Sequence, residues 1–410
     1  MNSPLTRLLP LRWRLWPLSL LALMSTTLAD DWPCFRGPNH DGISREKGWL
    51  TAWPETGLKR VWKAQVGTGF SSVSVAKGLV FTMGYSKGRE KVFCLDAKSG
   101  REIWSHAWPS AIGAKYYVGG PGSTPTVDGL HVFVTGKWGE VFCFARDTGK
   151  LLWRRNVAKQ DEVRVPTWGF NGSALVSGNR ILLNVGAAGM ALDRQTGKTL
   201  WKSADGEAGY ATPYPVSIGG KAHVAVSSGR AYSAVNIADG REAWSIRWFT
   251  RYGVNAADVI AHDGAVFVAS GYRKGCGLFR MGSEPKEIWK NKNLSTQFNS
   301  AVKIGGHLYG FNGDSGGPGI LRCVKWESGR IVWEQKLGFG SLMASDGKLI
   351  VLTAKGMLST APASPKGFSP TGQAQVLKSL CWTTPVLANV LLYCRNSKGD
   401  LVCLDLRVTP

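Results

Sequence analysis

The segment "VFCLDAKSGREIW" at residues 92–104 decides the fold, because the chain repeats its pattern along most of its length. An apolar run is followed by a turn that contains glycine and by a short arm that ends in tryptophan. The pattern returns at 141–153 as "VFCFARDTGKLLW" and at 189–201 as "GMALDRQTGKTLW". Two short apolar runs on either side of a glycine are typical of antiparallel strands joined by a tight turn. We therefore interpret each copy as a β-hairpin.

The terminal tryptophans of this repeat are spaced like the units of a propeller. The number of residues between consecutive repeat tryptophans is in the range that indicates a solenoid or a propeller. Each period contains further short strand signals and no amphipathic helix, which predicts four antiparallel strands per unit, the blade of a propeller. We expect these tryptophans on the outer strand of each blade, where a large flat ring covers the seam to the next blade. They are Trp62, Trp104, Trp153, Trp201, Trp244, Trp289 and Trp333.

The two ends of the repeat region complement each other. The last third-strand signal, at 401–408, has no fourth strand after it, whereas 58–64 is a fourth strand with no blade before it. We expect these two strands to pair, because pairing closes the ring and leaves no open sheet edge. The predicted fold is all-β, an eight-bladed β-propeller of four-stranded antiparallel blades over residues 58–410, closed through its N- and C-terminal strands.

The first 29 residues resemble a secretory signal peptide. Three arginines precede a short apolar core at 15–24, and Ala29 offers a small residue for cleavage. The apolar core is too short for a transmembrane helix, and we expect no membrane span elsewhere. Residues 1–29 therefore predict an exported protein, periplasmic or extracellular, and residues 30–57 a lead segment before the propeller.

Charge and composition restrict the partners. The formal net charge is +22, with lysine and arginine scattered along the chain. Such a charge predicts a weak, salt-sensitive attraction to anionic polymers. The chain has no basic helix and no nucleic-acid-binding motif, so we expect no nucleic-acid partner.

The eight cysteines do not form the pattern of a disulfide framework, although an exported protein can have one. Several occupy one equivalent position of the repeat, where a small buried residue is needed and free cysteine serves as one. We leave pairing open only for Cys34, Cys276 and Cys381.

The repeat resembles the pyrroloquinoline-quinone (PQQ) repeat, whose consensus is close to VYALDAxTGKxxW. The segments "DWPCFRGPNHDGIS" at 31–44 and "LCWTTPVL" at 380–387 resemble exported bacterial PQQ-like propeller proteins. The likeness covers almost all of 31–410. It implies a fold shared with BamB-type outer-membrane assembly proteins and with quinoprotein alcohol dehydrogenases. A shared fold does not choose between these functions.

The dehydrogenase alternative implies PQQ with calcium as cofactors, in an enzyme similar to polyvinyl alcohol dehydrogenase. Calcium needs several oxygen ligands close together. The acidic residues on the face that carries the longest predicted loops are spread over several blades. The adjacent cysteines found in some quinoproteins are absent from this sequence. We therefore assign no catalytic residue, no metal ligand and no cofactor. The acids are Asp161, Glu162, Asp205, Glu207 and Asp258.

The segment "GDSGGP" at 313–318 matches the nucleophile motif of the trypsin family. That chemistry needs a histidine base and an orienting acid. None of the six histidines stands in the sequence context of that family. We interpret the segment as a glycine-rich loop in blade six, with Ser315 inert.

The longest predicted loops, 105–122 and 154–171, lie on one face of the ring. Long loops on a rigid frame commonly carry function. Exposed tyrosine and tryptophan beside lysine and arginine suit an envelope protein, a glycan or an anionic polymer. We predict a monomeric, non-catalytic binding or assembly scaffold. Its candidate ligand-binding residues are Tyr117, Trp168, Tyr210, Trp248, Tyr252, Phe298 and Trp382.

Overall fold

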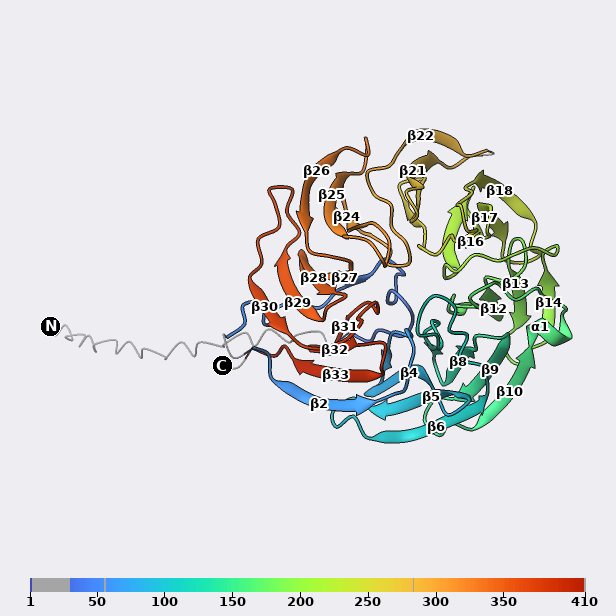
Figure 1. Ribbon diagram of the computed structural model, residues 1–410, viewed down its shortest axis with the longest axis horizontal. Helices are drawn as coiled ribbons and strands as arrows, with labels where there is room; N and C mark the ends of the chain where they lie inside the picture. Colours follow the sequence, from blue (N-terminus) through green and yellow to red (C-terminus); the bar gives the residue numbers. More distant parts are fainter. Residues whose placement is uncertain (2–29, 55–56, 283, 409–410) are drawn as a thin grey trace.

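In the computed structural model, all residues are described except 2–29, 55–56, 283 and 409–410. The predicted signal peptide thus lies almost entirely outside the described residues. The rest of the chain forms eight sheets arranged as a ring, and the prediction of an eight-bladed propeller is confirmed (Figure 1). Seven sheets have four strands, and the seventh blade gains a fifth from the lead segment.

The strands follow the chain from the axis to the rim in blades 1 to 7. Blade 1 contains β3 (Ser74–Ala76), β4 (Leu79–Ser86), β5 (Arg89–Asp96) and β6 (Glu102–Pro109). Blade 2 contains β7 (Thr126–Asp128), β8 (His131–Thr135), β9 (Glu140–Ala145) and β10 (Leu151–Asn156). Blade 3 contains β11 (Leu175–Ser177), β12 (Arg180–Leu183), β13 (Met190–Asp193) and β14 (Thr199–Lys202). Blade 4 contains β15 (Tyr214–Ile218), β16 (Lys221–Ser227), β17 (Ala231–Asn236) and β18 (Glu242–Arg247).

The second half of the ring repeats this order. Blade 5 contains β19 (Ile260–His262), β20 (Ala265–Ser270), β21 (Gly275–Arg280) and β22 (Lys286–Asn291). Blade 6 contains β23 (Val302–Ile304), β24 (His307–Asn312), β25 (Ile320–Lys325) and β26 (Ile331–Lys336). Blade 7 contains β27 (Gly340–Ser345), β28 (Lys348–Thr353), β29 (Met357–Pro362), β30 (Gly372–Gln375) and β1 (Ile43–Ser44). Blade 8 contains β31 (Val386–Ala388), β32 (Leu391–Arg395), β33 (Asp400–Asp405) and β2 (Arg60–Gln65).

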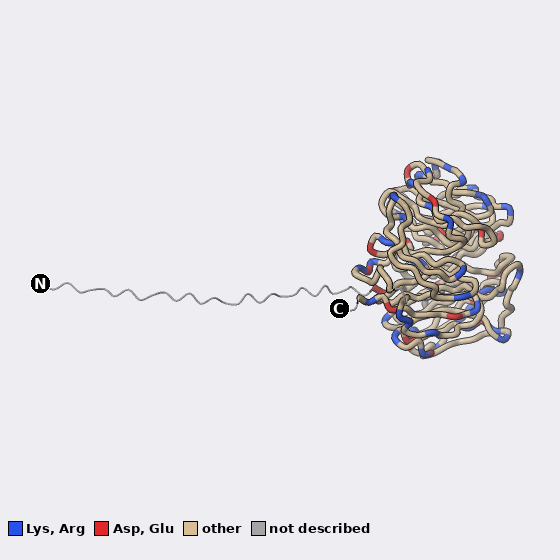
Figure 2. Tube along the Cα trace, turned by 60° about the vertical axis from the view of Figure 1, so that its left-hand side comes forward, with Lys and Arg blue, Asp and Glu red and all other residues tan. Residues whose placement is uncertain are grey.

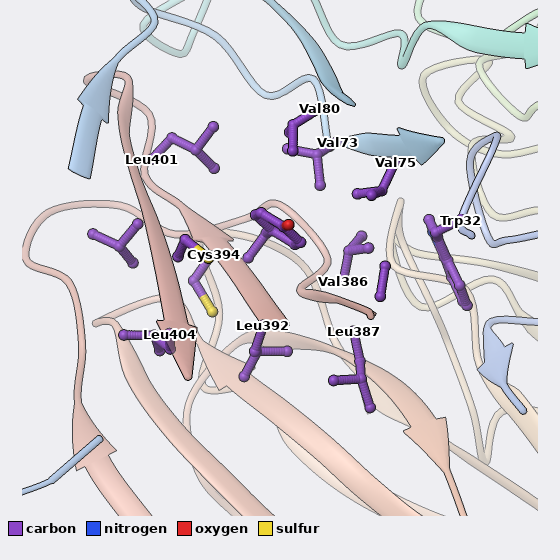
Figure 3. Packing of buried hydrophobic residues seen from close by; sticks show 14 of the residues in the cluster. Trp32, Val73, Val75, Val80, Val386, Leu387, Leu392, Cys394, Leu401 and Leu404 are labelled. Carbon is purple, nitrogen blue, oxygen red and sulfur yellow. The ribbon is translucent and has the colours of Figure 1, made fainter. Parts of the chain in front are cut away.

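The ring closes in blade 8, as expected, through strands from both ends of the chain. Strand β2 pairs antiparallel with β33, with Trp62 opposite Cys403, and the two strands lie side by side in Figure 1. Leu401 and Leu404 of β33 pack in one cluster with Val75 and Val80 of blade 1 (Figure 3). The closure is therefore a hydrophobic core as well as a hydrogen-bonded ladder.

Arg395 at the end of β32 ties blade 8 to blade 1. Its side chain is almost completely buried, and its Nη1 donates to the carbonyl oxygen of Ser71 at 2.8 Å and to Thr82 Oγ1 at 2.9 Å. Its Nη2 donates to the carbonyl oxygen of Gly67 at 3.0 Å. The planar guanidinium supplies several donors in a fixed geometry, which suits this cluster of main-chain acceptors.

Truncation tests the closure. Deleting residues 401–410 removes Leu401, Val402 and Leu404, each of which is buried. Since burial of one such side chain contributes about 1.5–3 kcal/mol, we expect thermal unfolding at least about 10 °C lower, or failure to fold. Deleting only 408–410 is the control, because Val408 is exposed. Equal melting of the two truncated proteins would show that β33 does not hold the ring closed.

Five of the eight seams contain a tryptophan that packs on the turn glycine of the next blade. Trp104 of β6 covers Gly149 of blade 2: a Cβ placed on this glycine would lie 2.6 Å from the indole. The Trp104 Nε1–H also donates to the carbonyl oxygen of Arg146 at 2.7 Å. We call this arrangement the Trp–Gly contact. It recurs between Trp62 and Gly100, Trp153 and Gly197, Trp201 and Gly240, and Trp289 and Gly329.

The two irregular blades depart from this arrangement. Blade 5 has Pro285 where other blades have the turn glycine, although Trp244 is still buried in a cluster shared with that blade. In blade 7, Trp53 of the lead segment lies against Gly372 of the outer strand. The indole Nε1–H of Trp333 donates to the carbonyl oxygen of Ser364 at 2.8 Å, which ties blade 6 to this blade.

Gly149→Ala tests the Trp–Gly contact against a matched glycine. Gly149 has φ +69° and faces Trp104, whereas Gly178 has φ +56° and open space for 4 Å around the position of an added Cβ. Both alanines bear the left-handed backbone cost of about 1–2 kcal/mol. Only Gly149→Ala also displaces the indole, which should cost a further ~1–3 kcal/mol in unfolding free energy. Chemical denaturation of both variants measures the difference, and equal destabilisation would contradict the proposed role of the contact.

The lead segment crosses the ring and binds its blades from the inside. The backbone N–H and carbonyl of Trp32 exchange hydrogen bonds with those of Val75 in blade 1, both at 2.8 Å. The carbonyl of Pro33 accepts from the N–H of Val127 in blade 2 at 2.7 Å, and β1 pairs parallel with β27 of blade 7. The segment is therefore an integral part of the propeller.

Glu46 of the lead segment holds a strained turn in blade 8. Its carboxylate accepts the backbone N–H groups of Asn389 and Val390, the latter at 2.8 Å. Both turn residues have positive φ, 58° and 57°. A β-branched residue rarely adopts this conformation, so the buried carboxylate stabilises a backbone that the sequence alone disfavours.

All eight cysteines of the sequence lie among the residues that the structure describes. All eight cysteines are free and buried, including Cys34, Cys276 and Cys381. Burial raises the pKa of the Cys34 thiol to about 12.

Lysine and arginine are spread over the side of the ring seen in Figure 2. Among the residues that the structure describes, no helix is both long and apolar enough to cross a bilayer.

Candidate functional site

A cavity of about 780 Å³ lies on the axis, at the face that carries the connections between blades. Aromatic side chains from these connections form its wall, and Phe35 of the lead segment contributes to its lining. Tyr116 and Tyr252 line it and are strongly exposed, 89% and 51%, so the cavity opens to solvent beside them. Its volume is in the usual range for small-molecule sites.

The aromatic wall has two parts on opposite sides of the axis. On one side, Trp382 stacks on Phe70 with ring centroids 5.1 Å apart and contacts Phe298 at 5.2 Å. On the other side, Trp168 meets Tyr210 edge to face at 5.8 Å. Trp382 precedes blade 8 and Tyr210 precedes blade 4, four blades away in a ring of eight. A ligand on the axis would therefore lie between aromatic faces.

The structure brings together most of the predicted binding residues. Tyr117, Trp168, Tyr210, Tyr252, Phe298 and Trp382 all line the cavity.

Trp248, which the sequence also offered as a candidate binding residue, is not among the residues that line the cavity. It is completely buried and packs edge to face on Phe279 of blade 5. The ammonium groups of Lys274 and Lys290 lie 4.9 and 5.1 Å from its ring. The residue follows β18 directly, so its indole continues the inter-blade packing instead of turning toward the axis.

Lys137 fixes the two main aromatic residues of the cavity and was not identified from the sequence. This completely buried lysine follows β8. Its Nζ donates to the phenol oxygen of Tyr117 and, at 2.7 Å, to the carbonyl oxygen of Trp168. Lys137 thus joins the connection before blade 2 to the connection before blade 3. A lysine in a strand–strand turn is normally exposed, so no signal in the sequence marked it.

The ionisation of this region is shifted by burial. Burial lowers the pKa of Lys137 to about 8, although the nearby Glu90 opposes this shift. Burial raises the pKa of Glu90 to about 7, and its carboxylate accepts the backbone N–H of Lys137 at 3.1 Å. A buried charge is tolerated when it is hydrogen-bonded in this way.

A polar belt surrounds the axis beneath the aromatic wall. Each member precedes the first strand of its blade by two residues, and its N–H donates to the side-chain oxygen of the next member at 2.8–3.2 Å. Ser72 Oγ extends the belt to blade 8 by donating to the carbonyl oxygen of Thr384 at 3.0 Å. The members, from blade 1 to blade 6, are Ser72, Thr124, Ser173, Thr212, Asp258 and Ser300.

Asp258 is the one carboxylate in this belt. Its Oδ1 accepts the N–H of Thr212 at 2.8 Å, and its Oδ2 lies 3.8 Å from Nε of Arg36 in the lead segment. Arg36 also donates to the carbonyl oxygen of Ala301 at 2.8 Å. Burial raises the pKa of Asp258 to about 6, against the opposing effect of Arg36. The ion pair anchors the lead segment under the cavity.

The sequence carries a periodic signal for this belt. A serine or threonine stands two residues before the first strand in five of the first six blades, and Asp258 replaces it in blade 5. This second periodicity accompanies the tryptophan repeat. By contrast, the pairing of Arg36 with Asp258 joins residues more than two hundred positions apart and follows no local pattern.

The GDSGGP loop lies at the cavity but acts as a structural link. Ser315 lines the cavity, and its N–H donates to Gln297 Oε1 at 2.6 Å. Asp314 Oδ1 accepts the N–H of Tyr272, a residue with φ +56°. All six histidines are among the described residues, and none lines the cavity. The loop lacks the base that activates a serine nucleophile.

Ser315→Ala tests this interpretation. We expect unchanged ligand binding and thermal stability, because only the backbone N–H of Ser315 makes a hydrogen bond among the described residues. A fluorophosphonate probe should not label the wild-type protein. Labelling that is lost in the variant would instead identify Ser315 as a nucleophile.

The eight blades, with a repeat tryptophan in seven outer strands, define a PQQ-like β-propeller. The family described as outer membrane protein assembly factor BamB matches residues 46–136 and 88–335. The chain belongs to this family, in agreement with the resemblance of its repeat.

Solved structures of two functional classes share the fold. BamB from Moraxella catarrhalis aligns with a TM-score of 0.63 and 15% identity, over 85% of this chain and 99% of that protein. A quinohemoprotein alcohol dehydrogenase from Pseudomonas putida HK5 aligns with a TM-score of 0.67 and 13% identity, over 93% of this chain and 81% of that protein. At such identities the likeness shows the fold alone.

Local sequence matches are to quinone-dependent dehydrogenases. A 1-butanol dehydrogenase (quinone) of Thauera butanivorans is 30% identical over 102 residues, which is 25% of this chain and 16% of that protein. A quinoprotein ethanol dehydrogenase of Pseudomonas aeruginosa is 31% identical over 107 residues, 25% of this chain and 17% of that protein. The matched part spans about a sixth of these relatives, so it does not decide between a scaffold and a dehydrogenase.

The residues around the cavity do not fit calcium-bound PQQ. Among the described residues, Asp258 is the one carboxylate that lines the cavity, and it already faces Arg36. Over the described part of the chain, no group of three or more His, Cys, Asp and Glu side chains is placed to hold a metal ion. Calcium takes six to eight oxygen ligands, several of them commonly carboxylates. We therefore derive no reaction through this cofactor.

Proposed function

We propose that this protein is an exported, non-catalytic binding protein whose ligand enters the axial cavity. The observation that carries the proposal is the cavity lining: aromatic residues from several blades meet there, and Lys137 holds two of them in place. A rigid frame that presents aromatic side chains around a concave site is suited to binding, because little conformational entropy is lost when the ligand arrives. The family description, an assembly factor, and the leader-like N-terminus support an envelope location.

A catalytic role has less support. Enzymatic general acid–base or metal-assisted chemistry needs several polar or charged groups arranged around the reacting atoms. Lys115 and Asp258 are the charged residues among those that line the cavity. Asp258 is engaged by the backbone of Thr212 and by Arg36, both of which belong to the structural frame.

Two tryptophan variants separate binding from folding. Trp168 is half-buried at the cavity, whereas Trp153 is a seam residue that is 9% exposed. We expect Trp168→Ala to weaken capture of the envelope ligand by about 2 kcal/mol, or about thirtyfold, with little loss of thermal stability. Trp153→Ala should destabilise folding by about 3–5 kcal/mol and leave the affinity of the folded fraction unchanged.

The measurement uses immobilised mature protein and solubilised envelope of the producing cell, beside thermal melting of each variant. Capture that survives Trp168→Ala while folding is lost would place Trp168 in the core and the site elsewhere. A parallel addition of PQQ and calcium addresses the dehydrogenase alternative. Dye-linked alcohol oxidation in that assay would overturn the non-catalytic proposal.

A further inference from the structure

We propose that the ligand of the axial cavity is the end of a neutral oligosaccharide chain. This inference rests on the proposed binding function and names the chemistry of its ligand. Four features of the cavity lead to it: the kinds of side chain that line it, its charge balance, its hydrogen-bonding groups and its shape.

The lining combines aromatic rings with hydroxyl and amide groups and contains almost no aliphatic surface. Val254 and Ala256 are the aliphatic residues among those that line the cavity. Sites for apolar peptides or lipids are mostly lined by aliphatic residues, since burial of apolar area drives their binding. A sugar ring has apolar C–H faces and a polar hydroxyl edge. Flat aromatic rings above polar groups match both properties.

The charge balance favours an uncharged ligand over an anionic one. Asp258 at the bottom of the cavity lies opposite Arg36, so these two charges offset each other. Lys115 at the mouth is exposed and therefore screened by solvent. Lys137 is turned toward Tyr117 and the carbonyl oxygens of Gly120 and Trp168. No cluster of cationic groups is left in the described lining to hold sulfate, phosphate or uronate groups.

The polar belt leaves hydrogen-bonding capacity for ligand hydroxyls. Ser173 and Thr212 each accept one neighbouring N–H, and neither hydroxyl donates to another described residue. Oδ2 of Asp258 is 3.8 Å from Arg36 Nε, which is too long for a hydrogen bond and leaves this oxygen as an acceptor. Donors and acceptors that alternate at the bottom of a cavity complement the hydroxyls of a sugar, each of which both donates and accepts.

The shape indicates a chain end and not an internal stretch of polymer. Phe35 of the lead segment lines the cavity, and Arg36 of the same segment lies beside Asp258 of the cavity lining. We therefore expect the ligand to enter and leave beside Tyr116 and Tyr252, where the cavity opens to solvent. A volume of about 780 Å³ accommodates a few sugar rings.

The test is calorimetric titration of the mature protein with neutral trisaccharides built on glucose, xylose, mannose and N-acetylglucosamine, beside trigalacturonate. We expect at least one neutral trisaccharide to bind, with an affinity that is the same at low and high salt. Trp168→Ala and Trp382→Ala should each lower that affinity at least about tenfold. Phe249→Ala is the matched control, because this aromatic residue is exposed in a connection of the same face and does not line the cavity.

Two outcomes overturn the saccharide assignment. One is binding of trigalacturonate alone, weakened by salt; the other is no binding of any trisaccharide. If envelope capture still depends on Trp168 in either case, the binding function stands and its ligand is a protein or an anionic polymer. If alcohol oxidation with PQQ and calcium appears instead, the binding function fails together with the saccharide.

Discussion

The Trp–Gly contact is the interaction on which the rest of this structure depends. A four-stranded blade has two apolar faces and cannot bury both alone, so the ring exists only if each seam is well packed. The contact combines a large buried area with a directional hydrogen bond from the indole, as between Trp104, Gly149 and the carbonyl oxygen of Arg146. The contact requires glycine for two reasons: the turn residue has a left-handed backbone conformation, and a side chain there would collide with the indole. The contact recurs at five seams of the ring, and Trp244 and Trp333 pack the seams before the two irregular blades in other ways.

Closure makes the frame rigid, and a rigid frame can position loops. Blade 8 is completed by β2 from the start of the propeller, and Arg395 binds it to blade 1. Without this closure the connections on the axial face would have no fixed relation to one another. With it, one buried lysine, Lys137, is enough to hold Tyr117 and Trp168 in place. Burying the charge of Lys137 costs free energy, and the hydrogen bonds of its ammonium group offset that cost.

The lead segment gives this propeller a different interior from that of an open ring. Its backbone joins blades 1, 2 and 7, Glu46 supports a strained turn in blade 8, and Arg36 reaches blades 5 and 6. Phe35 of the segment lines the cavity, and Asp258, which also lines it, faces Arg36 of the segment.

The sequence by itself determined the architecture: strand period, blade number and closure through the termini follow from local patterns that repeat, such as the hairpin at 92–104. It also indicated the face that carries the cavity and most of the aromatic residues that line it, because long connections and large rings are visible without coordinates. Only the tertiary structure decided which of them share a cavity. Trp248 is core packing, whereas Lys137 contacts Trp168 of the cavity wall and Arg36 pairs with Asp258 of its lining. These contacts join residues that lie far apart in the chain. They depend on how the loops and the lead segment fold over the axis, and a periodic sequence pattern does not predict that folding.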